Sequence, residues 1–134
     1  MIYSSSDILT ELKSATAVFR LADNGILHIH YLAHAEVGRQ EQIDNNRALI
    51  QLVGYTKHPL LIEGGEFASF TKEGLDTVKE LELSAPILAR AFVTRSLAQK
   101  IYVNFFLRFT SQIPMKTFES YENAVVWLLK FKID

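Results

Sequence analysis

Two histidines separated by one residue are the first candidates for chemistry in this sequence. His28 and His30 fall in a stretch predicted to be a β-strand, and residues two apart on a strand share one face. With His34 or a carboxylate such as Glu36 they could ligate a metal ion. The alternative is a histidine pair on a half-exposed sheet face, one member of which only forms a hydrogen bond. Because no Cys/His cluster and no H-E-x-x-H helix accompanies them, we expect no metal or other cofactor.

Two hydroxyl side chains form the second candidate group. Ser69 and Thr71 stand at the start of a predicted helix over residues 71–80. A phosphate at a helix N-terminus is stabilised by the free backbone N–H groups there, so both residues are candidate phosphoacceptors. In the alternative interpretation Thr71 only caps the helix, a role that its position explains completely.

A helix predicted over residues 95–109 has apolar side chains around more than half of its circumference. Three explanations stay open: burial between two neighbouring elements, a dimer contact, or the lining of a pocket for a small hydrophobic ligand. The candidate residues for the ligand or dimer surface are Tyr102, Phe105, Phe106 and Phe109.

Catalytic motifs are missing from the sequence. Glu36, Glu63 and Glu66 are expected near strand ends, where α/β folds tend to bind ligands, but isolated carboxylates in a chain with 15 acidic residues are mostly solvated. There is no glycine-rich phosphate loop, no G-x-S-x-G elbow and no assembled Ser/His/Asp spacing. We therefore predict that the protein is not an enzyme.

Composition excludes several other classes of protein. The 134 residues include 14 Lys and Arg against 15 Asp and Glu, a formal net charge of −1, so no bulk positive field attracts nucleic acid. Without cysteine there is neither a disulfide framework nor a thiol nucleophile. No secretory signal peptide and no apolar run long enough to span a bilayer is visible. We expect a cytoplasmic protein.

The elements that position these candidates follow from apolar periodicity. Residues 15–22 and 26–32 are predicted to form a β-hairpin, because Asp23-Asn24-Gly25 supplies the positive φ angles of a tight turn. Residues 86–94 are predicted to be a strand, although their alanines would also tolerate a helix. The other predicted elements are a helix over 37–53, a strand over 58–63, helices over 71–80 and 95–109, a strand over 114–118, and a final helix capped by Ser120.

Together these elements predict an α/β fold. Residues 1–134 are expected to form a single domain with an N-terminal hairpin followed by alternating strands and helices, which build a mostly parallel sheet with helices packed on it. Residues 1–12 are predicted to be a loose arm or a short helix capped by Ser6. In the helix over 37–53, amide residues such as Gln42 and Asn45 are predicted on the solvent side.

Three stretches carry a resemblance to a known family. They are the apolar strand and glycine pair over 58–65, the alanine-rich strand and aromatic helix over 89–107, and the closing F-x-x-Y-E-x-A-x-x-W-L segment over 118–128. This order resembles the STAS-type domain, in particular the SpoIIAA-like branch with its many uncharacterised bacterial members. In the phospho-switch members, a Ser or Thr after the third strand is phosphorylated, usually in an Asp-Ser-Gly context. The matching stretch here holds Ser69 and Thr71 without that tripeptide.

The resemblance implies a non-enzymatic interaction or regulatory module that binds a protein partner, with a homodimer as one form. The alternative function is binding of a small, lipid-like hydrophobic molecule in an apolar pocket under the helix over 95–109, as in related lipid-transfer proteins. A third hypothesis, which ranks last, is an enzyme that uses His28, His30 and Glu36.

Overall fold

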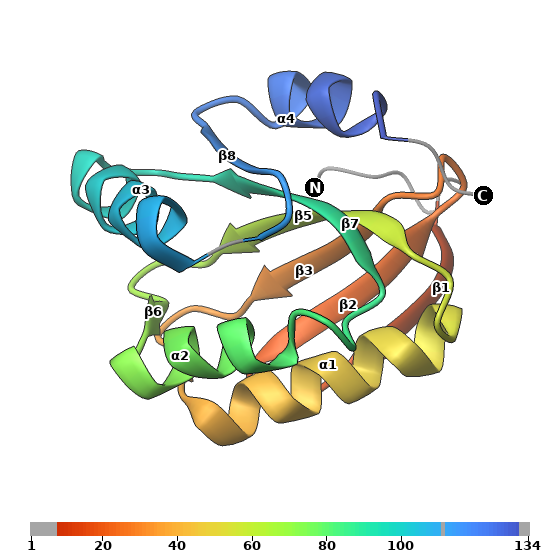
Figure 1. Ribbon diagram of the computed structural model, residues 1–134, viewed down its shortest axis with the longest axis horizontal. Helices are drawn as coiled ribbons and strands as arrows, with labels where there is room; N and C mark the ends of the chain where they lie inside the picture. The colour runs from red at the N-terminus through yellow and green to blue at the C-terminus, as the bar shows by residue number, and fades with distance from the viewer. Residues whose placement is uncertain (1–7, 111, 132–134) are drawn as a thin grey trace.

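The computed structural model describes residues 8–110 and 112–131, without the side chains of Tyr102 and of residues 105–110. A six-stranded sheet with strand order β1-β2-β3-β5-β7-β8 forms the centre (Figure 1). Strands β1 to β3 pair antiparallel, whereas β3, β5, β7 and β8 are parallel. The strands span Ile8–Lys13 (β1), Ala17–Ala22 (β2), Leu27–Tyr31 (β3), His58–Gly64 (β5), Ile87–Val93 (β7) and Met115–Phe118 (β8).

Helices cover both faces of this sheet. In Figure 1, α1 and α2 lie along one face, α4 lies on the other, and α3 stands at the end where the arrowheads of the parallel strands point. A second, two-stranded parallel sheet joins β4 to β6. These elements span Arg39–Val53 (α1), Lys72–Leu81 (α2), Leu97–Thr110 (α3), Tyr121–Leu128 (α4), Glu36–Val37 (β4) and Ser69–Phe70 (β6).

Several local predictions are confirmed. The hairpin of β2 and β3 turns at Gly25, whose φ is 86°, and the Asn24 side chain accepts a hydrogen bond from the Ile26 N–H at 3.1 Å. The predicted strand over 86–94 is confirmed as β7, which spans Ile87–Val93 and lies between β5 and β8. Thr71 and Ser120 cap α2 and α4 by accepting hydrogen bonds from the backbone N–H three residues on.

The predicted N-terminal arm over residues 1–12 is wrong for its described part. Residues 8–13 form the edge strand β1, and residues 1–7 lie outside the described residues. β1 pairs with β2, and Glu11 forms an ion pair with Arg20 at 2.7 Å. Its side chains are mostly exposed, so the strand is defined by backbone pairing rather than by an apolar pattern that a sequence would reveal.

The predicted orientation of α1 is also wrong in part. Gln42 and Asn45, expected on the solvent side, are buried together with Leu49 on the face that contacts the sheet. The inward amides are tolerated because the Asn45 side chain donates a hydrogen bond to the hydroxyl of Tyr31 on β3, at 2.9 Å. Hydrophobic periodicity alone could not locate this polar contact.

Two apolar cores lie on the two faces of the sheet. The larger core packs side chains of β2, β3 and β5, such as Phe19, Ile29 and Leu60, against α1. The smaller core packs Leu61 and Ala91 against Leu128 of α4. Among the described residues, no helix has the length and apolar character that crossing a membrane requires.

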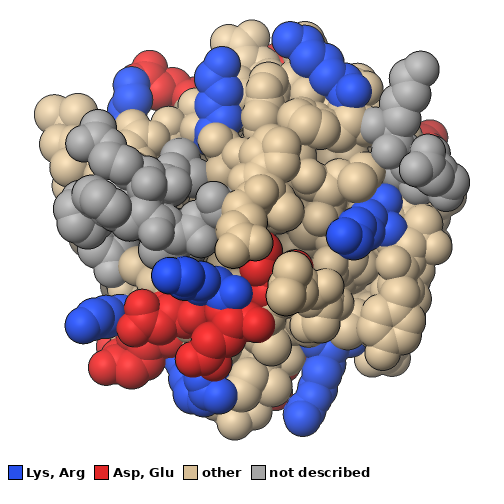
Figure 2. Space-filling model, viewed as in Figure 1, with Lys and Arg blue, Asp and Glu red and all other residues tan. Residues whose placement is uncertain are grey.

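The charged residues on the face seen in Figure 2 form no continuous basic patch. Lysine and arginine side chains stand apart from one another, whereas acidic side chains gather over α2. The exposed acidic residues of that helix are Glu73, Asp76 and Glu80.

The close approach of α2 to β4 gives a first testable prediction. A Cβ atom at the buried Gly74 would overlap the carbonyl oxygen of Val37. Alanine is normally the better helix former by about 1 kcal/mol, yet we expect Gly74→Ala to lower the free energy of unfolding by about 2 kcal/mol through overpacking. Urea denaturation measures the change.

Gly64→Ala is the matched control, because its Cβ would meet only the Ala68 side chain at 3.4 Å, an ordinary contact. A Gly74→Ala variant as stable as the wild type would show that α2 does not approach β4 so closely.

Candidate functional site

A cavity of about 450 Å³ lies beneath α3, where β5 and β7 end beside β6. Its walls are mainly apolar, and no charged side chain is among the described residues that line it. The lining residues are Tyr31, Val37, Ile62, Gly64, Ala68, Ser69, Phe70, Phe92, Val93, Thr94, Ala98, Gln99 and Val103.

Local hydrogen bonds fix the start of α3 over this cavity. The Ser96 hydroxyl accepts a hydrogen bond from the Gln99 N–H at 3.1 Å, and the Gln99 side chain accepts one from the Arg95 N–H at 2.8 Å. This is a variant of the capping box, in which a Ser and a Gln three residues later satisfy the first backbone donors. The Ser96-Leu97-Ala98-Gln99 spacing is the sequence signal that could have located this helix start.

The face of α3 that meets the cavity carries two aliphatic side chains and one amide. Ala98, Gln99 and Val103 line the cavity, whereas Leu97 and Ile101 are 72% and 61% exposed. The apolar surface of α3 is therefore divided between the cavity and the solvent.

The aromatic candidates on this helix are Tyr102, Phe105, Phe106 and Phe109, and their side chains lie outside the described part of the structure. Their role at a ligand or dimer surface stays a prediction.

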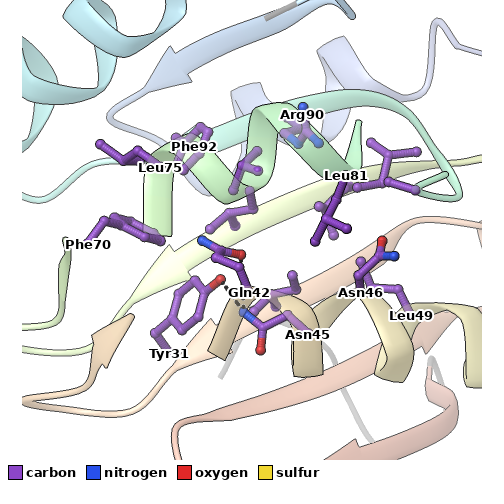
Figure 3. Close-up of a pocket in the computed structure, with 16 residues that line it drawn as sticks. Tyr31, Gln42, Asn45, Asn46, Leu49, Phe70, Leu75, Leu81, Arg90 and Phe92 are labelled. Carbon is purple, nitrogen blue, oxygen red and sulfur yellow. Dashed lines mark hydrogen bonds between the residues drawn. The ribbon is translucent and has the colours of Figure 1, made fainter. Parts of the chain in front are cut away.

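A narrow crevice of about 50 Å³, lined mainly by apolar side chains with a few polar groups, adjoins the cavity and lies deeper between α1, α2 and the sheet (Figure 3). Tyr31, Phe70 and Phe92 line both spaces. In Figure 3, Gln42 and Asn45 project from α1 toward the Tyr31 hydroxyl. The Asn45 Oδ1 atom is buried without a hydrogen-bond partner among the described residues.

Burial determines the ionisation state of the Tyr31 phenol in this crevice. Complete burial raises the pKa of the Tyr31 phenol well above its usual value, and the hydrogen bond from Asn45 offsets this only in part. The phenol is therefore neutral at physiological pH and serves as a hydrogen-bonding group.

A buried ion pair closes the far side of the crevice. Arg90 on β7 is 4% exposed and lies 3.3 Å from Glu82. Desolvation lowers the pKa of Arg90, and the negative charge of Glu82 counteracts that shift. Glu82 also accepts hydrogen bonds from the backbone N–H groups of Gln112 and Ile113, at 3.0 and 3.2 Å. Glu82 thereby connects the segment before β8 to the C-terminal end of α2, a contact that sequence reasoning missed.

The two candidate phosphoacceptors differ in their surroundings. Ser69 is exposed and lines the cavity. The Thr71 hydroxyl accepts a hydrogen bond from the Gly74 N–H at 3.0 Å, as its capping role requires. Phosphorylation of either residue stays a prediction.

The histidine pair lies on the opposite face of the sheet from the cavity, because side chains alternate along β3. His28 Nε2 is 2.8 Å from Glu63 Oε1, and the His28 ring stands edge-on to that of His30. The expected companions His34 and Glu36 are exposed, and His34 stacks on Phe67 instead. Glu63, which sequence reasoning treated only as an isolated carboxylate, is the acidic residue at the pair.

Comparison with known proteins bears on the fold. A sequence model for DUF7793, a domain of unknown function, matches residues 19–132. Among solved structures, the chain is similar to an uncharacterised protein of the DUF3478 family with a SpoIIAA-like fold from Shewanella loihica. The identity is 15%, the TM-score is 0.58, and the match covers 89% of this chain and 90% of that one. This likeness confirms the predicted SpoIIAA-like α/β fold. No curated protein matches the sequence.

The hydrogen bond between Tyr31 and Asn45 gives a second prediction. Tyr31→Phe leaves the Asn45 amide with only a long 3.5 Å contact to Gln42. We expect the free energy of unfolding to fall by about 1–3 kcal/mol, as for other buried groups that lose a partner. Urea denaturation of the variant tests this.

Tyr55→Phe serves as the control, since Tyr55 is 76% exposed and its change should stay within about 0.5 kcal/mol. Equal effects of the two substitutions would argue against a structural role for the crevice.

Proposed function

This chain belongs to the DUF7793 family of domains of unknown function, and we propose that it binds a small hydrophobic molecule in the cavity beneath α3. The observation that carries the proposal is the cavity itself. Its volume of about 450 Å³ falls within the roughly 300–1,000 Å³ typical of small-molecule sites. Apolar walls with a few hydroxyl and amide groups are the usual lining of such sites.

The lining also indicates the chemical class of the ligand. Ile62, Phe92 and Val103 provide apolar surface, while Ser69 and Gln99 add polar groups. Because none of the described lining residues is charged, an uncharged ligand or ligand segment fits better than a carboxylate or phosphate, whose burial without a partner is unfavourable.

The expected affinity follows from the burial of apolar area. A chain of ten buried methylene groups contributes about 8 kcal/mol, which corresponds to a dissociation constant of about 1 µM. Losses of translational and conformational freedom weaken this value. We therefore expect dissociation constants above about 1 µM for simple alkyl ligands.

A dye-displacement titration tests the proposal. Nile red, a neutral apolar dye, should bind the full chain with increased fluorescence, and decanol should displace it more effectively than decanoate. Ala98→Trp places a large side chain at a lining position and should weaken dye binding at least about tenfold, equivalent to about 1.4 kcal/mol.

Ile101→Trp is the matched control, because Ile101 is exposed on the same helix, as Ala98 is, but is not among the cavity-lining residues. The control should bind the dye as the wild type does. Equal affinities of the wild type and Ala98→Trp, with both folded by circular dichroism, would contradict the proposal.

A second candidate function is the non-enzymatic interaction module with a protein partner. The observation that favours it is the exposure of Leu97 and Ile101, one turn apart on the outer side of α3. Neighbouring exposed apolar side chains are a feature of protein contact surfaces, and a second copy of this chain is the first partner to consider.

A further inference from the structure

Three potential metal ligands meet on the face of the sheet that carries α4. His28 and His30 belong to β3, and Glu63 on β5 is paired with His30 in the parallel register. One ligand atom from each residue can be chosen such that all three lie within 4.8 Å of one another. Backbone pairing between the two adjacent strands therefore keeps the three side chains close to one another.

We propose that His28, His30 and Glu63 bind a divalent first-row transition-metal ion of the Zn²⁺ type. Two imidazoles and one carboxylate are a ligand set that such ions accept. Around a zinc ion about 2.0–2.1 Å from each ligand, the ligand atoms lie about 3.4 Å apart. Side-chain adjustments would bring the three ligand atoms to this separation. The ion would then take the place of the proton in the hydrogen bond between His28 and Glu63.

The site is buried but has a path to solvent. His28 and Glu63 are 1% and 6% exposed, so an ion there would be shielded from bulk water. Glu63 also lines a second, more polar cavity of about 540 Å³, formed with Thr94, Arg95 and Glu119 among others. An ion can enter through this cavity, and three protein ligands leave a coordination position free for water or another small ligand.

Equilibrium dialysis of the full, untagged chain against Zn²⁺, after removal of bound metal with a chelator, tests the proposal. We expect close to one zinc per chain for the wild type. Glu63→Gln and His30→Gln should each weaken zinc binding by at least about 100-fold, because each removes a direct ligand and the loss of an outer-shell partner alone costs 10–100-fold.

His34→Asn is the matched control. His34 is exposed, lies outside the cluster and has a φ of 63°, a backbone conformation that asparagine tolerates. This variant should bind zinc as the wild type does. Zinc bound equally by the wild type and His30→Gln would overturn the assignment, as would a wild-type chain that binds none.

A thermal melt separates loss of binding from loss of fold. Zinc should raise the melting temperature of the wild type and of His34→Asn, and should leave that of His30→Gln unchanged, while all three chains melt cooperatively without metal. A zinc-induced shift of equal size in His30→Gln would contradict the proposal. The result can be told apart from ligand binding beneath α3, because none of the three proposed metal ligands lines that cavity.

Discussion

The alternation of side chains along β3 is the constraint on which both candidate sites depend. Ile29 and Tyr31 project into the core beneath α1, whereas His28 and His30 project to the face that carries α4. A strand that shifted its register by one residue would exchange these two sets. β3 is fixed against such a shift because it is paired on both sides, antiparallel with β2 and parallel with β5.

The parallel half of the sheet decides where the cavities form. β3, β5 and β7 end at the same edge, and the chain leaves β7 through Thr94 to enter α3. Ligands of open α/β sheets tend to bind at this carboxyl edge of the strands. Here α3 stands over the edge, with the apolar cavity beneath it and the more polar cavity beside Glu63. The two spaces meet at Val93 and Thr94, which line both, and they differ in the charged residues Glu63, Arg95 and Glu119, which line only the second.

The polar groups of the interior show where sequence reasoning succeeds and where it fails. The hairpin at Gly25 and the caps Thr71 and Ser120 were predictable, because each depends on a local backbone conformation or hydrogen bond. The inward position of Gln42 and Asn45 was not predictable, because it depends on a contact with Tyr31, distant in the sequence.

The same distinction holds for the candidate sites. The His28-x-His30 spacing indicated the histidine pair, but Glu63 joins it from another strand, 35 residues away from His28. A pocket under the helix over 95–109 was one of three alternatives, and its walls come from segments that only the fold brings together. Residues 8–13 escaped prediction because edge strands need little apolar surface.

Native mass spectrometry of the full chain, purified from the organism that makes it, tests the central claim most directly. The account predicts a non-covalent mass of a few hundred daltons, the size of ligand that a cavity of this class holds. This additional mass should disappear on denaturation, and the released compound should be extractable into an apolar solvent. A chain that carries no additional mass as a monomer would contradict the proposed function. A dimer without additional mass would also contradict it, and would favour an interaction surface on the outer side of α3.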